Sequence, residues 1–424
     1  MTFIDLVDME RARKAAHMGL CHHCLGRLFA KVGHGMSNME RGEKIWAALI
    51  QQYEEEEGAR KAGSSFAMPE TCCLCENLFS EVDKFSDLIV KKLLPYEYDT
   101  FLVGSKVDFE VMEREEQLWG RLGCEHYEPI KAEINREVGK LVEHKVEKKV
   151  EFERPDITAV IDTRFDSVEL QIASLFIYGR YRKLERGIPQ TRWPCRACWG
   201  KGCVKCNQTG KMYQTSVEEI IAKEVMEATE GEEHSFHGMG REDIDARMLG
   251  SGRPFVLEIK NPKKRQLDLE KLKGRINRFA DSRVEVLDLR KSKKDEVVAI
   301  KDAEFPKTYE VEVEFEKHVK DEKLKEVVRA FKGKTIEQKT PQRVMHRRAD
   351  KVRKKKVFAI DATSKGDKGA VFTITGESGI YVKELIHGDE GRTKPSIAEY
   401  LDTHCAIKSL DVMKIHDNGG TRTW

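Results

Sequence analysis

The segment 240–255 carries side chains that could perform nucleophilic or acid–base chemistry. Asp243 and Asp245 stand two residues apart, and Arg241, Arg247 and Arg253 accompany them in a glycine-bounded stretch. Nearby guanidinium groups favour the ionised form of a carboxylate. An ionised carboxylate can act as a nucleophile or as a base. The alternative is a polar surface loop with local ion pairs, which contribute little on their own.

Paired cysteines form the second group of chemically distinctive residues. Eight of the 11 cysteines fall into C-x-x-C pairs, a pattern that favours thiolate–metal ligation over disulfides in a chain without a secretory signal. Cys21, Cys24, Cys72 and Cys75 predict one structural Zn²⁺, with free core thiols as the alternative. Cys195, Cys198, Cys203 and Cys206 form a second candidate site, or a short loop without metal. Neither set leaves an obvious open coordination position, so catalytic zinc is not expected.

Charge is unevenly distributed along the 424 residues. The formal net charge is +2, but residues 1–185 sum to −8 and residues 186–424 to +10. The stretch 332–356 holds 11 Lys/Arg against two acidic residues. This asymmetry favours a polyanionic partner for the C-terminal part, with a solvated basic surface as the alternative. The absence of a signal peptide or a long apolar run predicts a soluble, cytoplasmic protein without a membrane partner.

The helices and strands that must position these residues indicate an α+β protein. Hydrophobic periodicity, capping residues and turn signals predict helices over 86–94, 130–142, 216–229 and 267–279, and strands over 158–161, 168–178, 254–260, 309–315, 357–361, 370–375 and 380–386. We expect three parts, namely a cysteine-rich segment 1–80, an α+β module 81–185 and a larger domain 186–424 with a mostly antiparallel sheet.

Three motifs of the larger domain resemble those of pseudouridine synthases, in the same order. Gly240-Arg241-Glu242-Asp243 is similar to their G-R-x-D motif, Lys307-Thr308-Tyr309 to their K-x-Y motif, and Gly379-Ile380-Tyr381-Val382-Lys383-Glu384-Leu385 to their third motif. Further stretches resemble the archaeal and eukaryotic branch that modifies the T-loop of tRNA: 188–193, the loop 195–206, 338–350 and 387–396. That branch carries an N-terminal zinc-containing, THUMP-like module.

The resemblance implies a function, a fold and roles for particular residues. The fold would be a pseudouridine synthase domain, with a mixed sheet flanked by helices, behind the α+β accessory module. The substrate would be uridines 54 and 55 of the tRNA. Asp243 would be the catalytic nucleophile, and Tyr309, Tyr381, Arg241 and Lys383 would contact the substrate. Arg343, Arg347, Arg348 and Arg353 would contact the RNA backbone.

The reaction implied by the resemblance needs no redox step, so we expect no organic cofactor. We also expect no obligate protein partner. For both tyrosines the alternative role is core packing on a strand. For the whole chain the alternative is a non-catalytic zinc-containing tRNA-binding protein. A thiouridine synthase or a methyltransferase is disfavoured, because the sequence has neither G-x-x-x-x-G-K-[ST] nor a G-x-G-x-x-G loop after a strand.

Overall fold

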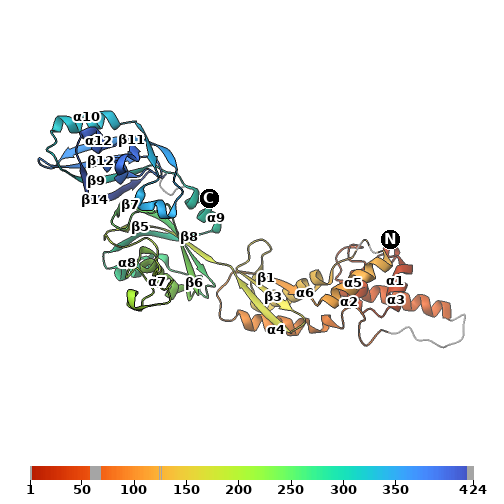
Figure 1. The fold of residues 1–424 in the computed structure, drawn as a ribbon. Helices are drawn as coiled ribbons and strands as arrows, with labels where there is room; N and C mark the ends of the chain where they lie inside the picture. Colours follow the sequence, from red (N-terminus) through yellow and green to blue (C-terminus); the bar gives the residue numbers. More distant parts are fainter. Residues whose placement is uncertain (1, 58–67, 124, 126, 418–424) are drawn as a thin grey trace. The chain divides into compact units, whose positions relative to one another are not determined.

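A computed structural model describes residues 2–57, 68–123, 125 and 127–417 of the chain, and it divides the chain into two compact units (Figure 1). The first unit is Met1–Ala173 and the second is Ser174–Trp424. Residues from 1–80 and from 81–168 share one hydrophobic core in the first unit. The division into three parts at residues 80 and 185 stays a prediction.

The first unit combines a bundle of helices with a four-stranded sheet of order β2-β1-β3-β4. β1 runs parallel to β2 and β3, and β4 is antiparallel to β3. Helix α6 buries Ile134, Val138 and Val142, which recur every four residues along one face and pack beside β1. The elements are α1 (Met9–His17), α2 (His22–Arg27), α3 (Asn38–Glu57), α4 (Val82–Leu93), β1 (Thr100–Lys106), α5 (Phe109–Leu122), α6 (Ile130–Val146), β2 (Lys149–Val150), β3 (Ile157–Asp162) and β4 (Ser167–Ile172).

The second unit is built on a ten-stranded sheet of order β13-β10-β11-β12-β9-β14-β7-β5-β8, with β6 paired to β7. All neighbours are antiparallel except β14 and β7, which are parallel. The elements are β5 (Leu175–Lys183), α7 (Val217–Thr229), β6 (Glu233–Gly238), β7 (Arg247–Lys260), α8 (Leu269–Ala280), β8 (Val284–Ser292), α9 (Lys294–Asp302), β9 (Lys307–Phe315), α10 (Asp321–Phe331), β10 (Thr335–Lys339), β11 (Val352–Ser364), β12 (Gly369–Gly376), α11 (Val382–His387), β13 (Thr393–Lys394), α12 (Ile397–Leu401) and β14 (Cys405–Ile415).

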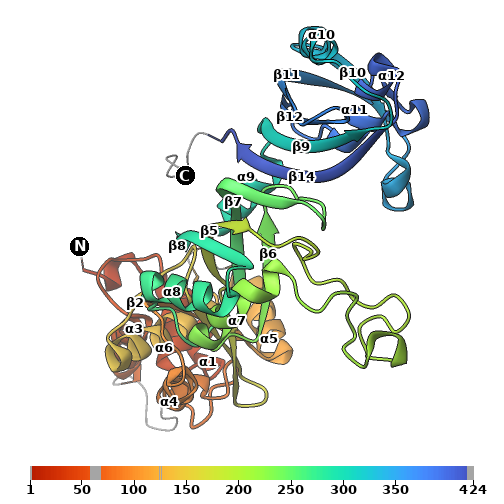
Figure 2. The same cartoon turned by 90° about the vertical axis from the view of Figure 1, so that its left-hand side faces the viewer.

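The predicted fold class is confirmed, including the mostly antiparallel sheet with helices around it. Helices α7 and α8 cover the part of the sheet near β8, and α10 covers β11 (Figures 1 and 2). Each half of the sheet has its own hydrophobic core. No helix in the described part of the chain is long and apolar enough to cross a bilayer.

Two of the predicted strands are wrong. The run 168–178 is not one strand, because β4 ends at Ile172 and β5 begins at Leu175 in the sheet of the other unit. Residues 382–387 form helix α11 and not a strand. Their buried apolar positions Val382, Leu385 and Ile386 follow the i, i+3, i+4 spacing of a helix face, and a six-residue run satisfies either periodicity.

Candidate active site

A cleft of about 580 Å³ in the second unit gathers all three motifs. The loop before β7, strands β9 and β14, and the segments around residues 343–348 and 378–383 form its walls. β14 lies between β7 and β9 in the sheet, so residues more than sixty positions apart in sequence face the same space. The cleft contains seven of the residues to which the sequence assigned a catalytic, substrate-binding or RNA-binding role: Arg241, Asp243, Tyr309, Arg343, Arg348, Tyr381 and Lys383.

Asp243 lies between two cations. Arg343 Nη1 donates to its Oδ1 at 3.0 Å, and Lys383 Nζ lies 3.5 Å from its Oδ2. The Asp243 side chain is 29% exposed, so it remains open to the cleft. Lys383 bonds Asp245 more closely, at 2.7 and 2.9 Å. Burial raises the pKa of Asp245, but the hydrogen bond and charge of Lys383 outweigh it and leave that pKa lowered.

Arg343 is itself held by a buried carboxylate. Its Nε donates to Glu384 Oε1 at 2.7 Å, and the Glu384 side chain is only 1% exposed. Burial lowers the pKa of Arg343, but Glu384 and Asp243 outweigh burial and leave that pKa raised, so the guanidinium stays charged. The sequence suggested that Arg343 contacts RNA phosphates. In the structure it is the closest partner of Asp243 and fixes the direction of that carboxylate.

The backbone of the Asp243 loop is anchored by Lys183, the last residue of β5. This lysine is fully buried, and its Nζ donates to the carbonyls of Ile188, Asp243 and Ile244 at 2.8, 3.1 and 3.0 Å. Burial lowers the pKa of Lys183 to about 8. Sequence analysis missed this residue, because a lone lysine at a strand end carries no motif.

A second buried pair fixes the residue before Asp243. Glu242 lies 2.8 Å from Arg253 Nε, and both side chains are essentially inaccessible to solvent. The Tyr181 hydroxyl donates to Glu242 at 2.9 Å, and burial raises the pKa of Tyr181. Arg253, which the sequence placed among the cations around Asp243, therefore neutralises Glu242 instead.

Two tyrosines and an arginine complete the cleft wall. Burial raises the pKa of Tyr309 to about 12, so its hydroxyl is protonated at neutral pH. The Tyr381 hydroxyl accepts a hydrogen bond from Arg348 Nη1 at 3.0 Å, and its backbone N–H donates to Gln338 at 2.8 Å. Arg241 lies over the ring of Trp193, with its guanidinium carbon 5.1 Å from the ring centroid.

The predicted RNA-contacting arginines Arg343, Arg348 and Arg353 differ in their hydrogen-bond partners. Arg343 and Arg348 lie in the cleft. Arg353 donates to Thr340 Oγ1 at 2.8 Å and to the Lys351 carbonyl at 3.3 Å, so part of its hydrogen-bonding capacity is used within the protein. The side chain of Arg347 lies outside the described residues.

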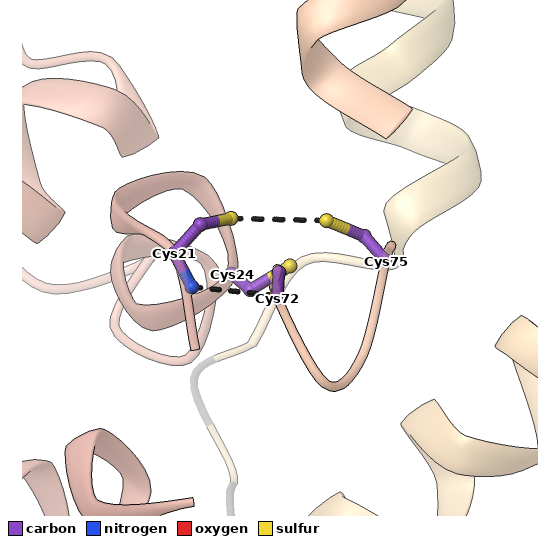
Figure 3. Close-up of side chains that lie close together, drawn as sticks. All are labelled: Cys21, Cys24, Cys72 and Cys75. Atoms are coloured by element: carbon purple, nitrogen blue, oxygen red, sulfur yellow. Dashed lines mark hydrogen bonds between the residues drawn. The ribbon is translucent and has the colours of Figure 1, made fainter. Parts of the chain in front are cut away.

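The first cysteine set forms a compact cluster in the first unit (Figure 3). The four Sγ atoms of Cys21, Cys24, Cys72 and Cys75 lie within 4.8 Å of one another, and those of Cys21 and Cys75 are 3.7 Å apart. A tetrahedral Zn²⁺ with Zn–S bonds of about 2.3 Å places its sulfurs about 3.8 Å apart. The buried Arg27 donates to Cys24 Sγ at 3.4 Å, which offsets thiolate charge. The donors therefore fit a metal ion.

The second cysteine set also converges, on an arm of the second unit that extends away from the sheet (lime in Figure 2). The Sγ atoms of Cys198 and Cys206 are 3.8 Å apart, and those of Cys195 and Cys203 are 4.0 Å apart. Backbone N–H groups of Gly202 and Gly210 donate to cysteine sulfurs at 3.2 Å, an arrangement that stabilises thiolates. This set fits a metal ion as well as the first does.

Comparison with known families agrees with this geometry. The family described as "Pus10, C-terminal" matches residues 176–416, and "Pus10 THUMP domain, archaeal" matches residues 85–162. The first match alone spans more than half of the chain. The chain belongs to the Pus10 family.

Curated relatives of the Pus10 family match along nearly the whole chain. Proteins named "tRNA pseudouridine synthase Pus10" are 42% identical in Methanothrix thermoacetophila, 41% in Methanopyrus kandleri and 44% in Methanocaldococcus jannaschii. These alignments cover 93%, 98% and 98% of this chain and 91%, 100% and 95% of the relatives. The resemblance inferred from the motifs, including the THUMP-like part, is confirmed at the level of the family.

Proposed function

We propose that this protein isomerises uridine to pseudouridine in the T-loop of tRNA, with Asp243 as the nucleophile. The observation that carries the proposal is the placement of Asp243 in an open cleft, between Arg343 and Lys383, in a chain of the Pus10 family. The two cationic partners fix the direction of the carboxylate, and a nucleophile requires a fixed direction. The activity as a tRNA pseudouridine synthase follows from the names of the relatives.

The reaction replaces the bond between the sugar and a ring nitrogen of uracil by a bond between the sugar and a ring carbon. The N1–C1′ glycosidic bond breaks, the uracil turns, and a C5–C1′ bond forms, while the C5 proton is lost and N1 gains a proton. Asp243 attacks the sugar or the uracil ring, or removes a sugar proton, and so opens the glycosidic bond. The ring of Tyr309 offers a flat surface for the free uracil, and the protonated hydroxyl can donate but cannot act as a base at neutral pH.

The target base must leave the tRNA stack before Asp243 can reach it, which costs a few kcal/mol. Six cationic and three acidic side chains line the cleft, so its formal charge favours the RNA backbone. The THUMP-like part binds the acceptor end of the tRNA in this proposal. The two cysteine clusters hold structural Zn²⁺ ions that fix their loops and take no part in the chemical step.

The proposal is tested by mapping pseudouridine in unmodified tRNA after incubation with the purified chain. We expect Asp243→Asn to bind tRNA as the wild type does and to form no pseudouridine. Asp245→Asn, the matched carboxylate two residues away, should keep measurable activity. An active Asp243→Asn with an inactive Asp245→Asn would move the nucleophile, and a wild type that binds tRNA without modifying it would favour a non-catalytic tRNA-binding protein.

A further inference from the structure

Lys307 is a cation of the cleft that pairs neither with Asp243 nor with a neighbouring carboxylate. Lys307 is the first residue of β9, and its side chain shares a strand face with Tyr309 two residues later. Its Nζ approaches one hydrogen-bond acceptor, the Phe305 carbonyl, at 3.5 Å. Among the described residues, no carboxylate lies within 4.0 Å of this ammonium. By contrast, Arg253, Arg343 and Lys383 each have an acidic partner in the cleft.

The surroundings of Lys307 are cationic. Burial lowers its pKa to about 8, the charges of Arg253 and Lys355 also lower it, and the charge of Glu304 opposes them. Lys355 is paired with Glu377 at 2.9 Å, and Arg253 is paired with Glu242. Keeping a half-buried ammonium without a counterion among other cations is unfavourable for the free protein. An anion bound at this end of the cleft would relieve that cost.

Glycines form the two turns of the cleft wall beside Lys307 and Lys355. A Cβ atom at Gly240 would lie 3.9 Å from Lys307 Nζ and 3.2 Å from Arg253 Nη1, and one at Gly379 would lie 3.9 Å from Lys355 Nζ. Both glycines have left-handed backbone angles, with φ of 74° and 80°. Glycine at these positions lets a ligand come close to the main chain, as it does in many phosphate-binding turns.

We propose that Lys307, together with the turns at Gly240 and Gly379, forms a binding subsite for a phosphodiester group of the RNA next to the flipped uridine. The inference rests on the proposed function and deepens it. Lys307 lies two residues from Tyr309 on the same strand face. When the base lies on Tyr309, the backbone of that nucleotide therefore passes Lys307. A lysine suits this role, because its ammonium acts as a compact point charge for phosphate. The contact would fix the register of the nucleotide without reading sequence.

The test uses T-arm stem-loop RNAs with a single uncharged methylphosphonate, either 5′ or 3′ of the target uridine. Their affinities are measured for the full chain, for Lys307→Met, Lys307→Gln and Lys307→Arg, and for Lys323→Met. Lys323 lies on α10, pairs with Glu326 at 2.8 Å and is not part of the cleft, so it serves as the matched control. Thermal unfolding of each variant checks that it folds.

We expect a methylphosphonate at one of the two positions to weaken binding by the wild type roughly tenfold, as the loss of one charge-assisted contact does. Lys307→Met and Lys307→Gln should bind the all-phosphate RNA roughly tenfold more weakly and should no longer respond to that methylphosphonate. Lys307→Arg and Lys323→Met should keep the response.

The proposal is overturned if the wild type responds to neither methylphosphonate. It is also overturned if the neutral Lys307 variants respond as strongly as the wild type does, because Lys307 would then face the base or another part of the RNA. Since binding and product formation are measured separately, the two proposals can fail separately. A wild type with the expected binding pattern that forms no pseudouridine would contradict the proposed function and leave the phosphodiester subsite standing.

Discussion

Arg343 links the candidate nucleophile to a buried carboxylate, and its replacement should have two separable effects. Arg343→Gln removes the 3.0 Å hydrogen bond to Asp243 and leaves Glu384, 1% exposed, without its cation. An unpaired buried carboxylate typically destabilises a fold by about 3–5 kcal/mol. Loss of a hydrogen bond between charged groups costs about 1.5–3 kcal/mol. If the transition state needs Asp243 in its present direction, that second cost slows isomerisation roughly ten- to a hundred-and-fifty-fold.

A second substitution separates the two effects. In Arg343→Gln/Glu384→Gln the buried carboxylate becomes a neutral amide of the same shape, so most of the lost stability should return. The rate should stay low, because Asp243 still lacks its partner. Arg275→Gln/Glu224→Gln is the matched control, since that pair joins α8 to α7 at 2.7 Å, with a 12% exposed Glu224 and no contact with the cleft.

The assays are thermal unfolding and single-turnover formation of pseudouridine in unmodified tRNA. The control double variant should turn over at the wild-type rate. If Arg343→Gln/Glu384→Gln also does so, Lys383 alone is sufficient to hold Asp243 and the role given to Arg343 is wrong. If the double variant is as unstable as Arg343→Gln, the destabilisation does not come from the unpaired Glu384.

Three further predictions concern the metal, the base and the RNA backbone. Cys24→Ser should lower the zinc content by one equivalent and lower the Tm without slowing the folded enzyme; unchanged metal content would refute the first site. Tyr309→Phe should keep most activity, whereas Tyr309→Leu should lose roughly ten- to a hundredfold for a stacking contact of ~1–3 kcal/mol; a wild-type rate in Tyr309→Leu would make Tyr309 a core residue. Arg348→Gln should weaken tRNA binding and reduce its salt slope by about one unit; an unchanged slope would mean that Arg348 serves only to orient Tyr381.

The elements of the fold were predictable where periodicity was long enough. The helix predicted over 267–279 and the alternating strand over 309–315 appear as α8 and β9, because each buries one regular face. Residues 380–386 misled the prediction, since three buried apolar positions in six residues do not separate a helix from a strand. The break between β4 and β5 was invisible, because both strands continue the same apolar run while they belong to different sheets.

The candidate site was predictable from its motifs but not from the residues that support it. Asp243, Tyr309 and Lys383 carry recognisable spacings and lie in one cleft. Lys183 and the Glu242–Arg253 pair act through backbone carbonyls and buried charge, which depend on tertiary contacts between distant strands. Arg343 was assigned to the RNA backbone, because a basic stretch in a sequence does not show which of its members turns toward a carboxylate.

The central position of β14 in the sheet sets an order of events during synthesis. β14 is the last described strand along the chain, yet it joins β9 on one side to β7 on the other. Its residues Leu410 and Val412 also line the cleft. Until β14 leaves the ribosome, β7 and β9 have no common neighbour in the sheet, and such long-range pairing forms late. A nascent chain that already displays Asp243 and Tyr309 but not yet β14 therefore lacks the part of the cleft wall that Leu410 and Val412 supply.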